Sequence, residues 1–356
     1  MCWVGRREAG PPFLLLPDFY YLCTMNSDFS SILLKWYGQN GRDLPWRHTR
    51  DPYAIWLSEV ILQQTRIAQG TGYWLRLIGR FPSVEALAKA SEDEVLLLWQ
   101  GLGYYSRARN LHAAARQIVA LGRFPDTAAG LKQLKGVGDY TAAAVASLAF
   151  GEDVAAVDGN VFRVLARVYG IEEPINTPRG KKVFAAMAQE LLPRGHAAAY
   201  NQAMMDFGAL QCTPKSPRCP ACPLQEVCVA RREGRVEALP VKLNKTKVQE
   251  RRLTYIYIRC GGCTAIHRRS PGDIWQGLWE PLLLEKGSMP QWRGRLTLLA
   301  KAVRHQLTHR TLFVDFYLLE TEERPPIPKD YIWIREEDFD HYAHPQIFEK
   351  IKNKLV

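Results

Sequence analysis

Four cysteines lie within 17 residues of this 356-residue chain: Cys212, Cys219, Cys222 and Cys228, spaced C-x6-C-x2-C-x5-C. The residues between these cysteines are rich in proline, which disfavours both a long helix and a strand. Four thiolates suit either zinc or an iron–sulfur cluster. Zinc ribbons usually pair two short C-x2-4-C knuckles, and this run contains one. The spacing therefore favours a [4Fe–4S] cluster, with zinc and a disulfide as the alternatives.

The composition limits the class of protein. The length allows two domains, and 47% hydrophobic with 11% aromatic residues excludes a disordered chain. No apolar run reaches the roughly 18–20 residues of a membrane span. The net charge of +11 favours a polyanionic partner over the alternative of a merely basic enzyme. Reduced thiolates imply a reducing compartment, so we expect a cytoplasmic protein, associated with the nucleoid if bacterial.

The first residues loosely resemble a signal peptide, with two arginines before a short apolar stretch. Pro11, Pro12, Pro17 and Asp18 interrupt that stretch, and no small-residue cleavage site follows. We expect residues 1–27 to be a disordered or wrongly assigned extension, with Met25 as the start of the working protein.

Residues 28–230 are expected to be helical, because apolar residues recur there at a spacing of three to four. Local signals mark the ends of the helices. Asp51-Pro52 supplies an N-cap followed by proline at the first helical position, and Gly101, Gly122 and Gly151 suit left-handed C-caps. The pattern predicts a mainly α N-terminal domain.

The composition of the sequence changes towards the C-terminus. Residues 231–252 carry eight Lys or Arg against three Glu and no aromatic residue, as expected of a basic linker. Residues 253–356 are rich in β-branched and aromatic residues separated by turn residues, which predicts a strand-rich α+β domain.

A tight turn, Leu134 to Gly138, leads directly into an Ala-rich helix. Gly136 and Gly138 let backbone N–H groups approach a ligand, and the helix N-terminus that follows favours a phosphate. The alternative is a plain connector between two helices. About twenty residues later Asp158 stands in an Asp-Gly-Asn turn that opens another apolar helix.

Together, these motifs resemble the helix–hairpin–helix DNA glycosylases of the endonuclease III superfamily, and most closely the MutY-type adenine DNA glycosylases. The resemblance implies two all-α lobes, a six-helix barrel and a cluster-bearing lobe, with duplex DNA between them. The motifs that carry it are SEVILQQT at 58–65, QGLGYYSRARNL at 100–111, LKGVGDYTAAAV at 134–145, VDGNVFRV at 157–164, NQAMMDFGALQC at 201–212 and the cysteine run.

Breaking an N-glycosidic bond requires an acid for the leaving base and a negative charge beside the cationic sugar. Glu59 lies in an apolar helix, where its pKa should be raised, and the resemblance implies that it protonates adenine. Asp158 at a helix N-terminus should stay ionised and stabilise the sugar, with Tyr140 and Asn160 implied as supports. Tyr140 stands where bifunctional relatives have a Schiff-base lysine, so we expect a monofunctional enzyme.

The target base must leave the duplex before it can react. The resemblance implies that Gln64 and Tyr104 enter the base stack, although Tyr104 could instead pack within its own turn. It also implies that Arg47 and Asp206 contact the extruded adenine. Arg107 and Arg109 are expected to contact phosphate or simply lie at the surface.

Residues 253–356 resemble the Nudix-like domain that such enzymes use to recognise 8-oxoguanine. The segment DIWQGLWEPLLLE at 273–285 carries the G-L-W-E turn, and no REUxEE-type metal motif follows. The loop that usually reads F-S-H is here Leu307-Thr308-His309, so Thr308 and His309 are the expected contacts and a wedge role for Leu307 is weakened. His305 is expected to be structural.

We therefore expect a monomeric base-excision enzyme that removes adenine from A:8-oxoguanine or A:G mispairs in double-stranded DNA. Two alternatives remain. One is a non-catalytic iron–sulfur DNA-binding protein, which the presence of both Glu59 and Asp158 disfavours. The other is a monofunctional glycosylase acting on thymine in G·T mispairs, which the C-terminal domain disfavours.

Overall fold

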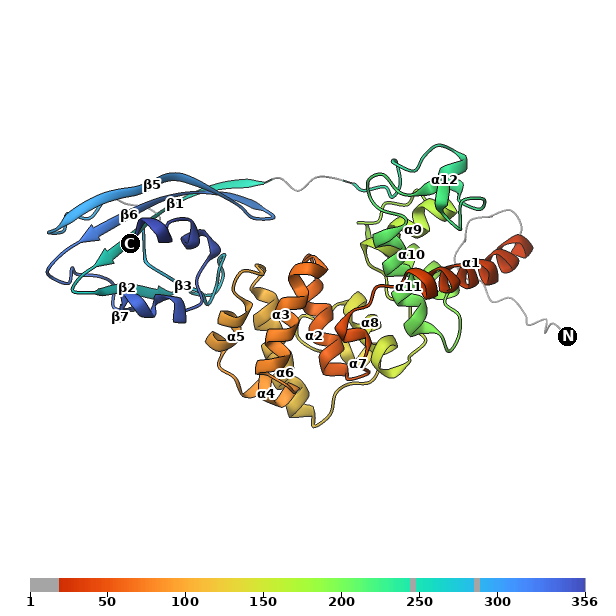
Figure 1. Ribbon diagram of the computed structural model, residues 1–356, viewed down its shortest axis with the longest axis horizontal. Coiled ribbons are helices and arrows are strands. Elements are labelled where there is room, and N and C mark those ends of the chain that lie inside the picture. The colour runs from red at the N-terminus through yellow and green to blue at the C-terminus, as the bar shows by residue number, and fades with distance from the viewer. Residues whose placement is uncertain (1–18, 244–247, 285–288, 356) are drawn as a thin grey trace. The chain divides into compact units, whose positions relative to one another are not determined.

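The computed structural model describes residues 19–243, 248–284 and 289–355 (Figure 1). It contains two compact units. The first combines residues up to Arg42 with Val157–Val241, and the second combines Asp43–Ala156 with Lys242–Val356. The helical region expected at 28–230 is thus divided between two helical lobes, because the chain leaves the first unit after Arg42 and returns to it at Val157.

The first unit is helical. Trp36 packs edge-on against Phe207 at 5.0 Å between ring centroids, and the Ser30 hydroxyl donates to the Leu191 carbonyl at 2.6 Å. Its elements are α1 (Phe19–Asn40), α9 (Gly159–Tyr169), α10 (Pro178–Glu190), α11 (Ala197–Leu210), η2 (Cys219–Ala221) and α12 (Val229–Arg232). Because α1 begins at Phe19, part of the extension expected to be disordered is helical. Residues 1–18 lie outside the described residues.

The helices of the second unit surround a core that contains the fully buried Trp56 and Trp99. Asp51 caps the N-terminus of α2 by accepting from the backbone N–H groups of Tyr53 and Ala54, and Gly122 ends α6 with φ 69°. These helices are η1 (Pro45–Arg47), α2 (Pro52–Leu62), α3 (Ile67–Arg80), α4 (Val84–Lys89), α5 (Glu92–Trp99), α6 (Ser106–Leu121), α7 (Ala128–Leu131) and α8 (Asp139–Phe150). The expected caps at Asp51 and Gly122 are confirmed.

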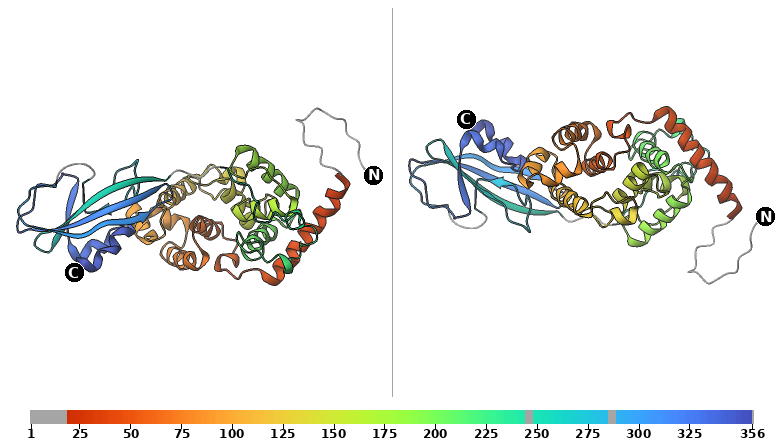
Figure 2. Two further views of the ribbon diagram at one scale, coloured as in Figure 1. Left: turned by 90° about the horizontal axis from the view of Figure 1, so that it is seen from above. Right: turned by 90° about the horizontal axis from the view of Figure 1, so that it is seen from below.

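The C-terminal part of the second unit holds two sheets, ordered β4-β1-β6-β5 and β3-β2-β7. Strand β1 runs parallel to β6, and β5 runs antiparallel to β6; these long strands lie side by side in both views of Figure 2. The strands are β1 (Gln249–Arg259), β2 (Cys263–Arg268), β3 (Trp279–Glu280), β4 (Leu282–Leu284), β5 (Arg295–Gln306), β6 (Arg310–Glu320) and β7 (Tyr331–Arg335). Short helices η3 (Glu336–His341), η4 (Gln346–Lys350) and η5 (Lys352–Lys354) follow. The expected α+β class is confirmed.

The sheets and helices of the second unit share a buried core. Leu278 and Ala343 belong to the same apolar cluster as Trp99. Polar contacts support this packing, since the Arg109 guanidinium donates to the Gln276 carbonyl at 2.6 Å. Deleting the C-terminal part would therefore expose apolar surface on the helices.

No helix among the described residues is long and apolar enough to cross a membrane.

Candidate active site

Glu59 is a buried carboxyl on α2, with 7% of its surface exposed. Every residue from Tyr53 to Ile61 on this helix is buried, so the apolar run seen in the sequence places the acid inside the unit. The Tyr140 hydroxyl on α8 donates a 2.8 Å hydrogen bond to Oε2 of Glu59. The two residues, 81 positions apart, thus form one polar pair in an apolar surrounding.

Asp158 caps the N-terminus of α9. Its Oδ1 accepts from the backbone N–H groups of Asn160 and Val161 at 2.8 and 2.9 Å, and its Oδ2 accepts from the Asn160 amide at 2.6 Å. Burial raises the pKa of Asp158, and these hydrogen bonds oppose that rise. All three partners are donors, which matches a carboxylate rather than a protonated acid.

Arg163 on α9 holds Asn160 in place and was missed by sequence reasoning. Its Nη2 donates to Oδ1 of Asn160 at 2.8 Å and to the Gly208 carbonyl at 2.6 Å, while Nε donates to the Cys212 carbonyl at 2.7 Å. A Cβ on Gly208 would lie 2.5 Å from that of Asn160, so only glycine lets α11 approach the start of α9. One buried arginine therefore links the Asp158 turn to residues 212–228, which we call the thiol segment.

The four cysteines of the run line one small cavity of about 20 Å³. Arg167 closes one side, donating to Sγ of Cys212 at 3.5 Å and to the Thr213 carbonyl at 2.7 Å. Burial raises the pKa of Cys222 to about 11, and a bound metal would be needed to keep this thiol ionised at neutral pH. The four thiols form a donor set that fits a thiolate-bound metal centre, and the arginine places a positive charge beside it.

The spacing of the sulfur atoms distinguishes between metal centres. A tetrahedral zinc ion with Zn–S bonds of about 2.3 Å draws its sulfur ligands to about 3.8 Å from one another. No three of the sulfur atoms of Cys212, Cys219, Cys222 and Cys228 lie within 4.8 Å of one another. The four thiols are therefore not set at the spacing of a single tetrahedral zinc ion.

The turn expected to bind phosphate lies between α7 and α8. Gly136 has φ +75°, and a Cβ there would meet Cβ of Asn110 at 2.6 Å, so glycine is required. Gly138 precedes α8, whose N-terminus has no side-chain cap. The first N–H groups of the helix therefore receive no hydrogen bond from a side chain at the cap position.

Gln64 and Tyr104 share an unusual backbone. Each has a positive φ, 57° and 47° respectively, which is uncommon for residues other than glycine. Both are exposed, Tyr104 to 45%. Strained conformations of this kind are costly and are found at functional sites.

Arg107 on α6 binds the end of α2, which leads to Gln64, and the loop that carries Tyr104. Its Nη1 donates to the carbonyls of Val60 and Ile61 at 3.0 and 2.9 Å, and its Nη2 donates to those of Leu102 and Gly103 at 3.4 and 3.3 Å. Burial lowers its pKa to about 10. The expectation of a phosphate or surface contact is wrong for this residue, because its guanidinium is buried among carbonyls.

Thr308 and His309 are exposed at the tip of the β5–β6 hairpin. The Thr308 hydroxyl forms a hydrogen bond with the Tyr104 hydroxyl, so these two residues, which are distant in the sequence, are in contact. Leu307 packs against the apolar core of the C-terminal sheets, in line with its weakened wedge role. His305 stacks edge-on against Trp275, as expected of a structural histidine.

The residues expected to contact adenine have different surroundings. Asp206 on α11 is fully buried, and its carboxylate accepts from the backbone N–H of Arg42 at 2.9 Å and from its Nε at 2.8 Å. Arg47 ends η1 and is half-buried.

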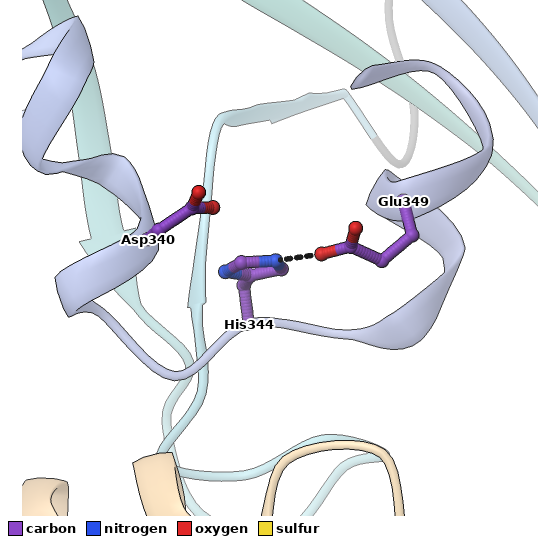
Figure 3. A group of neighbouring side chains, drawn as sticks. All are labelled: Asp340, His344 and Glu349. Carbon is purple, nitrogen blue, oxygen red and sulfur yellow. Dashed lines mark hydrogen bonds and ion pairs between the residues drawn. The ribbon is translucent and has the colours of Figure 1, made fainter. Parts of the chain in front are cut away.

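A second group of ligand-type residues lies near the C-terminus: Asp340, His344 and Glu349 (Figure 3). Its members already have protein partners. Nδ1 of His344 contacts the Tyr342 carbonyl and its Nε2 contacts Glu349, both at 2.9 Å, while Asp340 accepts from Lys352. These contacts account for the group as packing of the terminal segment, and we assign no metal to it.

Two family models match the chain. The model of the HhH-GPD superfamily of base excision DNA repair proteins matches residues 57–193, and that of the NUDIX domain matches residues 254–354. The first match covers Glu59, Tyr140 and Asp158, and the second covers the hairpin with Thr308.

Curated relatives carry one activity in their names. The adenine DNA glycosylase of Buchnera aphidicola subsp. Acyrthosiphon pisum is 35% identical over 70% of this chain and 73% of its own. That of Buchnera aphidicola subsp. Baizongia pistaciae is 31% identical over 81% and 84%. The human adenine DNA glycosylase is 44% identical over 59% of this chain, which spans 41% of that longer protein.

Solved structures share the helical fold. A thermostable thymine-DNA glycosylase aligns with a TM-score of 0.56 and 32% identity, covering 60% of this chain and 99% of its own. A non-covalent endonuclease III–DNA complex aligns with a TM-score of 0.52 and 23% identity over 59% and 97%, a likeness that concerns the fold alone.

Proposed function

Because this chain belongs to the adenine DNA glycosylase family of HhH-GPD base excision repair proteins, we propose that it removes adenine paired with 8-oxoguanine or guanine and leaves the DNA strand intact. The chain is a DNA N-glycosylase of base excision repair. The observation that carries the finer proposal is the contact between the buried Glu59 and the partly buried Tyr140. It combines an acid with a residue that cannot form a Schiff base.

The chemistry follows from two carboxyl groups in different settings. Glu59 lies within the buried run of α2 and, in its acid form, can donate a proton to the leaving adenine. Asp158 receives three N–H donors, so its charge can stabilise the positive sugar that forms as the bond breaks. Water then adds to the sugar and leaves an abasic site.

Tyr140 decides the product. A bifunctional glycosylase uses a lysine amine to attack the sugar, and the resulting Schiff base allows the strand to be cut. A phenol cannot form that adduct. Tyr140 instead hydrogen-bonds Glu59 and orients the acid, so the reaction stops at base release.

The cofactor proposed for Cys212, Cys219, Cys222 and Cys228 is a [4Fe–4S] cluster. Two observations support this proposal: the four thiols line one cavity, and their spacing in the sequence is typical of iron–sulfur ligands. When bound, the cluster would hold together a loop that contains little regular structure. Arg167 contributes a positive charge beside one ligand.

The proposed partner is duplex DNA, bound by a monomer. Gln64 and Tyr104 enter the base stack when the adenine is extruded, and the turn at Gly136 and Gly138 binds the backbone phosphate. Thr308 and His309 contact the 8-oxoguanine opposite the adenine. Their exposure on the hairpin supports this assignment.

One experiment tests the proposal. The protein is incubated with duplexes containing A opposite 8-oxoguanine, A opposite G, A opposite T, and T opposite G, and strands are then analysed with and without alkali. We expect cleavage after alkali for the first two duplexes only. Excision of thymine, the activity in the name of the structural neighbour, would assign the chain to another specificity, and strand cuts before alkali would contradict the role of Tyr140.

A further inference from the structure

Two cysteines outside the thiol segment face each other across a hairpin turn. Cys260 and Cys263 flank Gly261-Gly262 between β1 and β2. The two cysteines exchange both backbone hydrogen bonds, at 2.9 and 3.0 Å. Both glycines have positive φ, 54° and 72°, as a tight two-residue turn of this kind requires. Directly opposed residues in such a pair project to the same face.

The separation expected between the two Cα atoms permits a bond between the sulfur atoms. Opposed residues in a hydrogen-bonded antiparallel pair have Cα atoms about 5.5 Å apart, inside the range of roughly 4.4–6.8 Å seen for disulfides. Both thiols are free in this structure. The Cβ atoms of such a pair lie at or beyond the upper end of the disulfide range, so the bond would be under some strain and easily reduced.

The two thiols differ in access. Cys260 is buried and Cys263 is half-buried, so an oxidant from solvent would reach Cys263 first and Cys260 would be the resolving thiol. Metal binding is a poor alternative, since among the described residues no third His, Cys, Asp or Glu ligand joins this pair.

We propose that Cys260 and Cys263 form a reversible redox pair that is oxidised by low-molecular-weight disulfides. The Cys263 thiolate attacks one sulfur of the small disulfide and releases one small thiol, which leaves a mixed disulfide. The Cys260 thiolate then attacks the Cys263 sulfur and releases the second small thiol. Two electrons pass from the protein to the oxidant, and the two thiol protons end on the released thiols.

The bond would join the two sheets of the C-terminal domain at one end. Strand β1 belongs to the four-stranded sheet and β2 to the three-stranded sheet. A disulfide in the turn between them would therefore link the two sheets covalently. Neither cysteine belongs to the residues assigned to base removal, so excision of adenine should continue at the same rate in both states.

Tryptic mapping tests the proposal directly. Cleavage after Arg259 and Arg268 gives the peptide CGGCTAIHR, which contains both cysteines and no other. The full-length protein is exposed to oxidised glutathione, alkylated, digested without reductant and weighed by mass spectrometry. We expect this peptide to escape alkylation and to be about 2 Da lighter than the dithiol form, and a dithiol reductant should restore both alkylation sites.

Single-cysteine variants separate the steps. Cys260→Ser should retain a glutathione adduct on Cys263, because no resolving thiol remains, and Cys263→Ser should react more slowly at the buried Cys260. The proposal is overturned if both cysteines of the wild type remain open to alkylation under conditions in which the Cys260→Ser variant gains a glutathione adduct. It is also overturned if the wild type accumulates stable glutathione adducts and no bond between Cys260 and Cys263.

Discussion

The Tyr140 hydroxyl donates a hydrogen bond of 2.8 Å to the buried carboxyl of Glu59. This contact joins the residue proposed to protonate adenine with the residue that replaces a lysine nucleophile. Since a buried carboxyl is sensitive to the loss of a single partner, the pair can be tested by substitutions that leave its shape unchanged.

Glu59→Gln should lower the single-turnover rate of adenine removal by about a hundredfold to a thousandfold, because an amide cannot donate the required proton.

Tyr140→Phe should lower the same rate less, by about tenfold to a hundredfold, because it removes one hydrogen bond to the acid. Duplex binding should be unchanged in both. The exposed Glu85→Gln serves as a control, and full activity in Glu59→Gln would show that the acid lies elsewhere.

The pH dependence should report on Asp158. Burial raises its pKa above the ordinary aspartate value, so the rate should fall as the pH drops through this raised pKa, where the carboxylate takes up a proton. Asn160 donates hydrogen bonds that lower that pKa. Asn160→Ala should therefore move the acid limb of the rate profile to higher pH, and a limb that moves to lower pH would contradict the assignment.

Arg107 should act by positioning the loops of Gln64 and Tyr104. Arg107→Lys keeps the charge, but an ammonium cannot reach both the carbonyls at the end of α2 and those of the loop before α6. We therefore expect about a tenfold to hundredfold loss of rate. Base extrusion, followed by fluorescence of 2-aminopurine at the target position, should weaken in parallel. Arg116→Lys, at an exposed position on the same helix, is the matched control. If base extrusion is normal in Arg107→Lys, the residue does not act by positioning Gln64 and Tyr104.

Gly208→Ala should disturb the active site from a neighbouring helix. The added methyl group would lie 2.5 Å from Cβ and 3.0 Å from Cα of Asn160, which forces α11 and α9 apart at a cost of about 1–3 kcal/mol in the free energy of unfolding. The rate should fall as Asn160 moves. Gly159→Ala adds its methyl group next to the same residue in open space, and equal losses in the two variants would argue against the steric cause. Thermal unfolding and single-turnover rates supply both measurements.

Thr308→Ala combined with His309→Ala should reduce the preference for 8-oxoguanine over guanine by about tenfold to a hundredfold, as expected if two contacts to the base are lost. Removal of adenine opposite guanine should persist. Point variants suit this test better than truncation, because Leu278 and Ala343 pack into the core shared with the helices. Thr297→Ala on the exposed part of β5 is the control. If the double variant keeps the wild-type ratio of rates on the 8-oxoguanine and guanine duplexes, other residues recognise the 8-oxoguanine.

Local chemistry made much of the fold predictable. The cap at Asp51 and the helix end at Gly122 depend on hydrogen bonds and backbone angles within a few residues, so the sequence alone placed them. The cap at Asp158 is equally local. The apolar surroundings of Glu59 were also visible, because nine consecutive residues of α2 are buried together. The cysteine spacing indicated a metal centre for the same reason, since its ligands lie close in the chain.

Tertiary packing decided the rest. Arg107 looked like a surface or phosphate-binding residue, yet its partners Val60 and Ile61 lie 47 and 46 positions away, and no local pattern marks a cation held by carbonyls. Gly208 matters because another helix touches it. Cys260 and Cys263 are a candidate disulfide pair only because the hairpin turn sets them opposite each other. Sequence determines what each residue can do within its own segment, whereas contacts between distant segments depend on how the helices and sheets pack.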